Sequence, residues 1–203
     1  MSSKNYLKML LAGCLSAGCL TLFATSSDHK VGEFGTVVLE NAAELEGDLE
    51  AWWDIGVCYR DGLGVKKDMK KAIQWFEKAA NRNYDNACVS LGDLYYYGDS
   101  VKQDYKKAFE LYSRALRRNL PDAQYRLGLC SYMGHGTKQD KKLAAEWFLK
   151  AAEQQEPNSQ YMMGVCLEKG EGVKKDLKKA KEYYKKAADA KHEKAIAALK
   201  RLK

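Results

Sequence analysis

The chain has 203 residues, a formal net charge of +7 and a hydrophobic fraction of 46%, which suits one globular or repeat domain. Its three histidines, His29, His135 and His192, lie far apart in the sequence, and this spacing excludes the paired histidines of a zincin-type metal site. No serine has the strand–turn–helix context of a nucleophile elbow. We therefore expect no metal, no cofactor and no catalytic activity.

Residues 1–27 have the pattern of a bacterial export signal. Lys4 and Lys8 give the segment a positive start, and residues 9–24 are apolar and small. This run is too short, and too interrupted by glycine, to span a bilayer comfortably. The pattern therefore favours a signal sequence over a membrane helix, and we expect the chain to be exported.

Three fates of this segment remain open. Residues 15–19 resemble a lipobox, which makes Cys19 the lipidation candidate and the first residue of a mature lipoprotein. Alternatively, signal peptidase cleaves after Ser26, or the segment stays uncleaved as a membrane anchor. The expected location is the periplasm, either as a free protein or as a membrane-anchored lipoprotein, with secretion as a third alternative.

Residues 28–48 are expected to form a tether ahead of the folded domain. Within the tether, residues 34–46 contain Phe34, Val37, Val38 and Leu39, followed by two alanines. This pattern is compatible with a degenerate leading helix.

From residue 49 onward the sequence repeats with a step of 36 residues. Gly56 returns as Gly92, Gly128 and Gly164, and most of its surroundings return with it. The same step relates three further sets, which are Gly62, Gly98, Gly134 and Gly170; Asp68, Asp104, Asp140 and Asp176; and Ala72, Ala108, Ala144 and Ala180. A fixed period of this length is the signature of a solenoid of stacked units. We place the repeats at residues 49–84, 85–120, 121–156 and 157–192.

The residues of one period predict an antiparallel pair of helices. Small and apolar side chains recur at helical spacing in residues 85–97 and again in residues 105–116. Gly98 suits the left-handed end of the first helix, and Asp104 suits the N-cap of the second. Because Gly92 lies in the buried stripe, we expect it to let the two helix backbones approach closely.

The ends of the domain follow from the same phasing. Pro121 and Pro157 are the only prolines of the chain and lie 36 residues apart, where a first helical residue belongs. Residues 193–203, rich in Lys and Ala, predict a closing helix with a polar outer face, as a solenoid requires. We therefore expect an all-α fold over residues 49–203. It is an α/α solenoid of about four 36-residue helix pairs with a C-terminal capping helix.

Several short motifs recur within the repeats. They are Ala87, Leu91-Gly92 and Tyr95 in one helix, Gly-x-Gly-Val at residues 62–65 and 170–173, Asp-x-x-Lys-Ala at residues 68–72, and Trp-Phe-x-Lys-Ala-Ala at residues 75–80. Together they resemble the Sel1-like repeat, a relative of the tetratricopeptide repeat. Ser100 and Thr137 depart from the turn motif. The resemblance implies a superhelix that scaffolds protein complexes or signalling, with no catalytic residues to carry over.

In related superhelices the first helices line the concave surface, so partner-binding residues are sought at first-helix positions outside the shared packing stripe. These positions are rich in Trp and Tyr, which are favoured at binding hot spots. The candidates are Trp53, Arg60, Asp93, Tyr96, Tyr125, Tyr132, Tyr161 and Glu168. The alternative is that some of them pack between neighbouring first helices.

The expected function is a non-catalytic scaffold or adaptor of the bacterial cell envelope that binds a protein partner in this groove. The alternative function is a carbohydrate-directed or peptidoglycan-directed envelope module, in which tyrosines stack on sugar rings. The export signal argues against nucleic acid as a partner. Membrane contact is expected only through the N-terminal signal or a lipid anchor.

Lysines gather at the turn into each second helix, and stacking would line them along one basic edge. The four clusters are Lys66, Lys67, Lys70 and Lys71; Lys102, Lys106 and Lys107; Lys138, Lys141 and Lys142; and Lys174, Lys175, Lys178 and Lys179. Lysine at a helix N-terminus opposes the macrodipole, so helix stability alone does not favour it. The edge is either a solvated surface that keeps the protein soluble or a binding surface for an anionic partner.

Four cysteines lie within the repeats. Cys58, Cys130 and Cys166 share one place, two residues after the recurring glycine. Equivalent positions in adjacent helices lie about 8–10 Å apart, beyond the limit of roughly 7 Å between disulfide Cα atoms. We therefore expect these residues and Cys88 to be reduced, buried thiols that pack as small apolar side chains.

Overall fold

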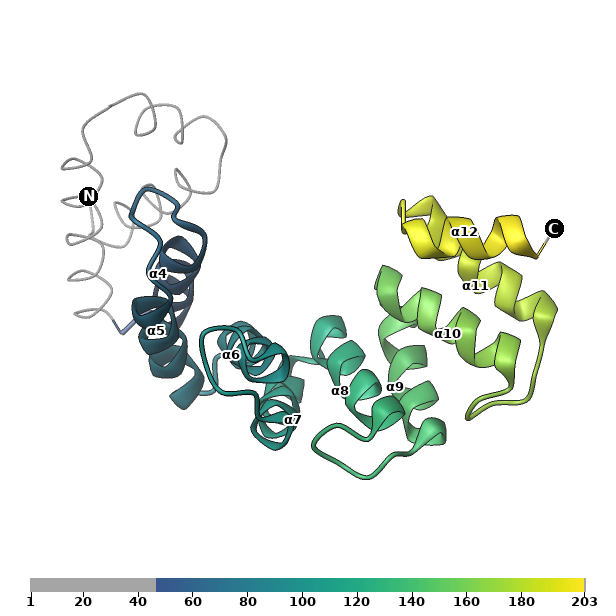
Figure 1. The fold of residues 1–203 in the computed structure, drawn as a ribbon, viewed down its shortest axis with the longest axis horizontal. Coiled ribbons are helices and arrows are strands. Elements are labelled where there is room, and N and C mark those ends of the chain that lie inside the picture. The colour runs from purple at the N-terminus through teal and green to yellow at the C-terminus, as the bar shows by residue number, and fades with distance from the viewer. Residues whose placement is uncertain (1–46, 203) are drawn as a thin grey trace. The chain divides into compact units, whose positions relative to one another are not determined.

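The computed structural model describes residues 47–202. Over this range the chain forms nine α-helices, one 3₁₀ helix and no strand (Figure 1). The chain divides into two compact units inside helix α6, between Leu91 and Gly92. The predicted signal at 1–27, the lipidation candidate Cys19 and the leading helix at 34–46 lie outside the described residues.

The helices follow the predicted repeats. The first unit contains α4 (Leu49–Asp61), α5 (Met69–Asn81) and the first half of α6 (Asp85–Tyr97). The second unit contains the rest of α6, then α7 (Tyr105–Arg114), η1 (Ala115–Arg118), α8 (Pro121–Met133), α9 (Lys141–Glu153), α10 (Pro157–Lys169), α11 (Leu177–Asp189) and α12 (Glu193–Arg201). First helices thus begin at residues 49, 85, 121 and 157, and the capping helix begins at 193. The predicted repeat boundaries are confirmed.

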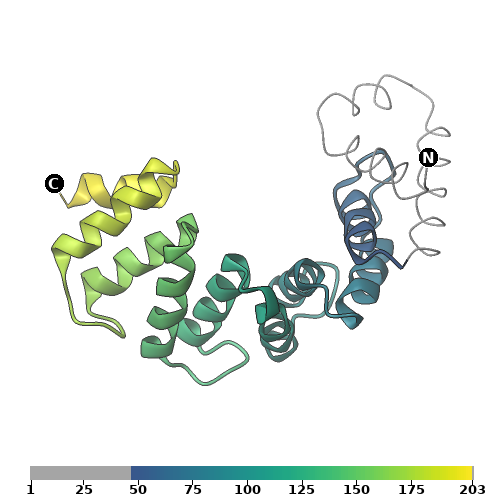
Figure 2. The same ribbon diagram turned by 180° about the vertical axis from the view of Figure 1, so that it is seen from behind.

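Figure 2 shows the second unit as successive helix pairs, with α8 against α9 and α10 against α11. Helix α9 also packs on α10, and α11 packs on α12, so each second helix contacts the next first helix. No helix within residues 47–202 is long and apolar enough to cross a membrane.

The helix ends agree with the predicted caps. The Asp104 carboxylate accepts a hydrogen bond from the Lys107 backbone N–H at 2.9 Å, which fills one of the free donors of α7. Asp68, Asp140 and Asp176 cap α5, α9 and α11 in the same way. Pro121 and Pro157 occupy the first turns of α8 and α10, where a missing N–H costs nothing. Local chemistry therefore sets where the second helix of each repeat begins.

The recurring helix glycine makes room for an aromatic ring and not, as predicted, for a close approach of two backbones. A Cβ atom at Gly128 would lie 2.5 Å from a ring carbon of Phe148 in α9. The other three pairs, with ring distances of 2.5 or 2.6 Å, are Gly56 with Phe76, Gly92 with Tyr112 and Gly164 with Tyr184. All four rings are buried. The prediction named the right position but the wrong neighbour, because the ring lies between the two helix backbones.

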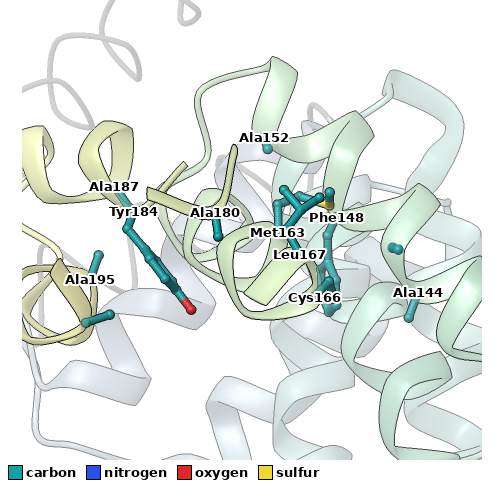
Figure 3. Close-up of a cluster of buried hydrophobic side chains, with 12 residues drawn as sticks. Ala144, Phe148, Ala152, Met163, Cys166, Leu167, Ala180, Tyr184, Ala187 and Ala195 are labelled. Atoms are coloured by element: carbon teal, nitrogen blue, oxygen red, sulfur yellow. The ribbon is translucent and has the colours of Figure 1, made fainter. Parts of the chain in front are cut away.

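One core cluster of the second unit is built around two of these rings, and another contains Tyr112. Phe148 and Tyr184 lie among alanines and among side chains such as Met163, Cys166 and Leu167 of α10 (Figure 3). Small side chains such as these alanines allow helix axes to come within the 8–10 Å of packed helices. This cluster therefore consists of two large rings packed among small side chains.

The second glycine of the turn motif joins one repeat to the next. A Cβ atom at Gly172 would lie 1.9 Å from the carbonyl oxygen of Lys141, the first residue of α9. Gly136 meets the carbonyl oxygen of Tyr105 in the same way, at 2.1 Å. Gly64 has a similar positive φ of 70°, but no atom of residues 47–202 lies within 4 Å of its Cβ position. The glycine at residues 136 and 172 is thus required by packing as well as by turn geometry.

The cysteines are mostly buried, as predicted. Cys88, Cys130 and Cys166 are buried, whereas Cys58 in α4 is half-buried, so the prediction of burial is wrong for Cys58. Burial raises the pKa of the Cys130 thiol to about 12 and that of Cys166 to about 11, which keeps both thiols protonated at neutral pH. In the described residues these four cysteines are not joined to one another; their reduced state stays a prediction.

Candidate functional site

The predicted binding residues lie on the first helices and are half-buried. Two of them belong to the first unit, and six belong to the second. We call the surface formed by those six residues the first-helix face, and they are Asp93, Tyr96, Tyr125, Tyr132, Tyr161 and Glu168. This face runs over the end of α6 and over α8 and α10.

In the first unit, Trp53 and Arg60 have local partners. The Trp53 indole N–H donates to the Ser90 hydroxyl at 2.9 Å, and its ring packs at a tilt against Tyr84 with centroids 6.4 Å apart. Arg60 forms an ion pair with its neighbour Asp61 at 2.7 Å. An ion pair this exposed contributes little to stability.

Asp93 links two repeats in the second unit. One carboxylate oxygen accepts a hydrogen bond from the Tyr112 hydroxyl at 2.6 Å, and the other forms an ion pair with Arg126 of α8 at 2.8 Å. Burial raises the pKa of Asp93, and the Arg126 charge and the Tyr112 hydrogen bond only partly oppose it. The carboxylate is therefore held by its partners at some cost and is not available as a free binding group.

Glu168 in α10 makes the same two kinds of contact, one with a core tyrosine and one with an arginine. It accepts a hydrogen bond from the Tyr184 hydroxyl at 2.7 Å and forms an ion pair with Arg201 of α12 at 2.7 Å. Burial alone would raise the pKa of Glu168, but the bonds from Tyr184 and Arg201 outweigh it and lower the pKa. Glu168 is thus ionised and ties the capping helix to α10.

Tyr96 and Tyr132 reach the turn of the following repeat. The Tyr96 hydroxyl shares a hydrogen bond with Nδ1 of His135 at 3.0 Å, and the Tyr132 hydroxyl donates to the Glu171 carboxylate. Lys141 completes the second contact through an ion pair with Glu171 at 2.8 Å. His135 and Glu171 lie 36 residues apart, so the same position of the turn is held in both repeats.

Tyr125 and Tyr161 pack against the core rings of their own repeats. The Tyr125 ring lies at a tilt, 6.1 Å from the Phe148 ring, and the Tyr161 ring lies 5.7 Å from the Tyr184 ring. Tyr161 also stacks on His192, with centroids 4.8 Å apart. These rings therefore contribute to packing as well as to the surface.

The sequence-based prediction missed two exposed residues that directly follow Tyr96 and Tyr132, and we include them in the first-helix face from here on. Tyr97 and Met133 end α6 and α8, and 60% and 53% of their respective surfaces are exposed. They lie 36 residues apart in equivalent positions, and Lys169 follows in α10. The sequence does carry a signal for them. In both repeats a large apolar side chain stands directly before the glycine that ends the first helix.

The structure brings two predicted residues into one pocket. Tyr161 and Glu168 line a cavity of about 510 Å³ between α10 and α12, floored in part by Tyr184 of α11. The other four candidates of the first-helix face do not line it. The eight predicted residues therefore do not form a single site, and their role in binding stays a prediction.

The lysine clusters are exposed in both units, with Lys141 half-buried as the exception. Some of the lysines have structural partners. The Lys107 ammonium lies 4.0 Å from the centre of the Tyr95 ring and 2.6 Å from its hydroxyl oxygen, a favourable cation–π contact. Such contacts explain the presence of some of these lysines by their role in packing. The binding of an anionic partner stays a prediction.

No group of three or more potential metal ligands occurs among the described residues.

The chain matches one protein-family model, described as the Sel1 repeat, in four consecutive segments. The segments are residues 50–84, 85–120, 121–156 and 157–192. They coincide with the repeats placed from the 36-residue step, apart from one residue at the first boundary.

Solved structures that are similar to this chain include two repeat proteins of bacteria. The protective antigen c5321 of uropathogenic Escherichia coli, which displays an SLR fold, is 37% identical with a TM-score of 0.72, and the match covers 76% of this chain and 33% of that chain. A Sel1 repeat protein from Oxalobacter formigenes is 24% identical with a TM-score of 0.77, and the match covers 97% of this chain and 82% of that chain. The predicted all-α solenoid is confirmed.

A curated relative is the chitin synthase regulator SKT5 of Saccharomyces cerevisiae. It is 32% identical over 97 residues, which are 44% of this chain and 13% of the relative. The chain therefore spans only a small part of that protein and a third of the Escherichia coli antigen.

His192 at the start of α12 predicts a pH dependence of stability. Its Nδ1 accepts the Ala195 backbone N–H at 3.2 Å, which requires a neutral imidazole. Burial and the charge of Lys194 lower the pKa of His192, against the opposing charge of Glu156. Below the ordinary pKa near 6.5, the unfolded chain therefore takes up a proton that the folded chain excludes, so stability falls as pH falls.

We expect His192→Asn to remove the part of the pH dependence of stability that arises from His192, because asparagine caps a helix without titrating. Between pH 7.5 and 5.5, wild type should lose about 1 kcal/mol more unfolding free energy than His192→Asn, the size of a lost N-cap. Urea unfolding followed by circular dichroism at both pH values measures this difference. Equal losses in the two proteins would contradict the role of His192.

Proposed function

Since this chain belongs to the Sel1 repeat family, we propose that it is a non-catalytic scaffold that holds a partner protein on its first-helix face. Sel1 repeat proteins are generally protein-interaction scaffolds and bind protein partners. The observation that carries the proposal is the exposed pair Tyr97 and Met133. A large aromatic and a methionine left uncovered at equivalent positions of neighbouring repeats are side chains that interfaces favour.

Most residues of the first-helix face have partners within the chain. Asp93, Tyr96 and Tyr132 hold neighbouring repeats together, and Glu168 holds the capping helix on the last repeat. A face held by such contacts is rigid, so a partner binds it without a large cost in ordering the surface. Tyr97 and Met133 are then the side chains that a partner covers, and the tied residues set the spacing between them.

We also propose that the chain acts in the bacterial cell envelope as a lipoprotein. The support is the pattern of residues 1–27, with a positive start, an apolar run and Cys19 at the end of a lipobox-like motif. Incorporation of radiolabelled palmitate by wild type and its loss in Cys19→Ala is the expected result. Labelling that persists in Cys19→Ala would contradict lipidation at this residue.

A carbohydrate-directed module is the second candidate. It is favoured by the curated relative, whose name describes a regulator of chitin synthase. An exposed tyrosine such as Tyr97 is also a side chain that stacks on sugar rings. Sedimentation of the purified chain with peptidoglycan that has been stripped of protein would support this candidate over a protein partner.

The Tyr97→Ser, Met133→Ser double variant tests the scaffold function. Hot-spot side chains typically contribute about 2 kcal/mol or more each, so we expect at least tenfold less partner recovered by affinity capture from crosslinked envelope. The matched control is Leu143→Ser, Leu149→Ser, which removes two exposed apolar side chains from α9 of the same unit. Unchanged helicity in circular dichroism shows that both variants are folded. Equal recovery from the double variant and the control would contradict the proposed face.

A further inference from the structure

The pocket between α10 and α12 lies at the end of the first-helix face. Its walls are apolar and aromatic, and they include Val165, Ala197 and Ala198 together with the rings of Tyr161 and Tyr184. Its volume of about 510 Å³ falls in the range of sites for small ligands or for one or two inserted side chains.

The capping helix carries a small residue at a position that is large in α8 and α10. Ala198 follows Arg126 and Met162 at the 36-residue step. Arg126 extends back from α8 to Asp93 and to the Tyr97 hydroxyl of α6. A methyl group at residue 198 cannot reach α10 in this way. The space between α10 and α12 therefore stays open.

The rim of the pocket is positively charged. Its one carboxylate, Glu168, is engaged by Tyr184 and by Arg201. Lys169 and Lys194 are exposed, and neither forms an ion pair with any residue in the range 47–202. An apolar floor beside two exposed ammonium groups that form no ion pair complements a ligand that is apolar at one point and anionic beside it.

The charge of the surrounding chain reinforces this preference. Residues 174–203 contain twelve Lys or Arg and four Asp or Glu, a net charge of +8, whereas the whole chain has +7. The rest of the chain is therefore nearly neutral. A field of one sign around a concave site raises the local concentration of the opposite charge.

We propose that this pocket binds an acidic peptide segment of the partner protein, with one apolar side chain in the pocket and flanking carboxylates on Lys169 and Lys194. The inference rests on the proposed scaffold function and specifies the chemistry of the partner. An inorganic anion alone would leave the apolar floor unfilled, and a purely apolar segment would leave the two ammonium groups without partners. The segment thus contributes both kinds of contact at one place.

The test uses the full-length protein and a fluorescein-labelled eight-residue peptide with a central leucine between aspartates. Its counterparts carry asparagine or lysine in place of aspartate. We expect saturable binding of the aspartate peptide by fluorescence anisotropy, at least tenfold tighter than that of either counterpart. Binding should weaken as salt is raised, because the charges are exposed and screened.

Three variants locate the binding. Ala198→Met places in the pocket the side chain that α10 has at the equivalent position, and it should weaken binding at least tenfold. Lys169→Gln with Lys194→Gln should weaken binding about three- to tenfold, the effect expected of two exposed charge pairs. The control Lys138→Gln with Lys142→Gln removes the same charge from exposed positions outside the pocket and should change binding less than twofold.

Three outcomes would overturn the inference. The first is no binding of the aspartate peptide, and the second is binding that Ala198→Met leaves unchanged. The third is an equal loss in the two lysine pairs, which would mean attraction by overall charge. Binding to phosphatidylglycerol vesicles in place of the peptide, with sensitivity to Ala198→Met, would assign the pocket to lipid instead.

The proposed function fails separately. If the peptide does not bind but Tyr97→Ser, Met133→Ser still loses a captured partner, the scaffold function stands and the acidic segment is wrong. If the double variant captures as well as its control, the first-helix face is wrong whatever the peptide does.

Discussion

The contact on which the rest of the structure depends is an aromatic ring laid on a glycine. In each repeat the ring belongs to the second helix and the glycine to the first, as in Phe148 and Gly128. Burying such a ring contributes about 2–3 kcal/mol, whereas glycine inside a helix costs roughly 0.5–1 kcal/mol, so the contact is favourable overall. It sets one spacing for the two helices of a repeat.

The type of ring in the core affects which residues stand on the surface. Where the ring is a tyrosine, its buried hydroxyl needs a partner; Tyr112 finds Asp93, and Tyr184 finds Glu168. Each acid then pairs with an arginine 33 residues further on. The repeats with Phe76 or Phe148 carry no acid at these two surface positions. A tyrosine in the core is therefore accompanied by an acid of the first-helix face that joins two helices of the stack, whereas a phenylalanine is not.

Features that depend on neighbouring residues could be predicted from the sequence. The caps at Asp104 and Pro121 and the helix starts are local, and the 36-residue step carries them through four repeats. The partners of Tyr96 and Asp93 could not be predicted in this way, because they depend on how one repeat sits on the next. The pairing of a core tyrosine with a surface acid is nevertheless present in the sequence and was overlooked. Tyr97 was missed because it lies one residue beyond Tyr96, the last candidate position in that helix.

The most direct test of the ring-on-glycine contact is a double-mutant cycle at Gly128 and Phe148, measured by urea unfolding of the full chain. Gly128→Ala should destabilise by about 2–3 kcal/mol through overpacking. In a Phe148→Leu background the same change should cost less than about 1 kcal/mol, because the ring that excludes the Cβ is gone. A cost that is equal in both backgrounds would contradict the account. So would a stabilisation of about 1 kcal/mol by Gly128→Ala, the effect of helix propensity alone.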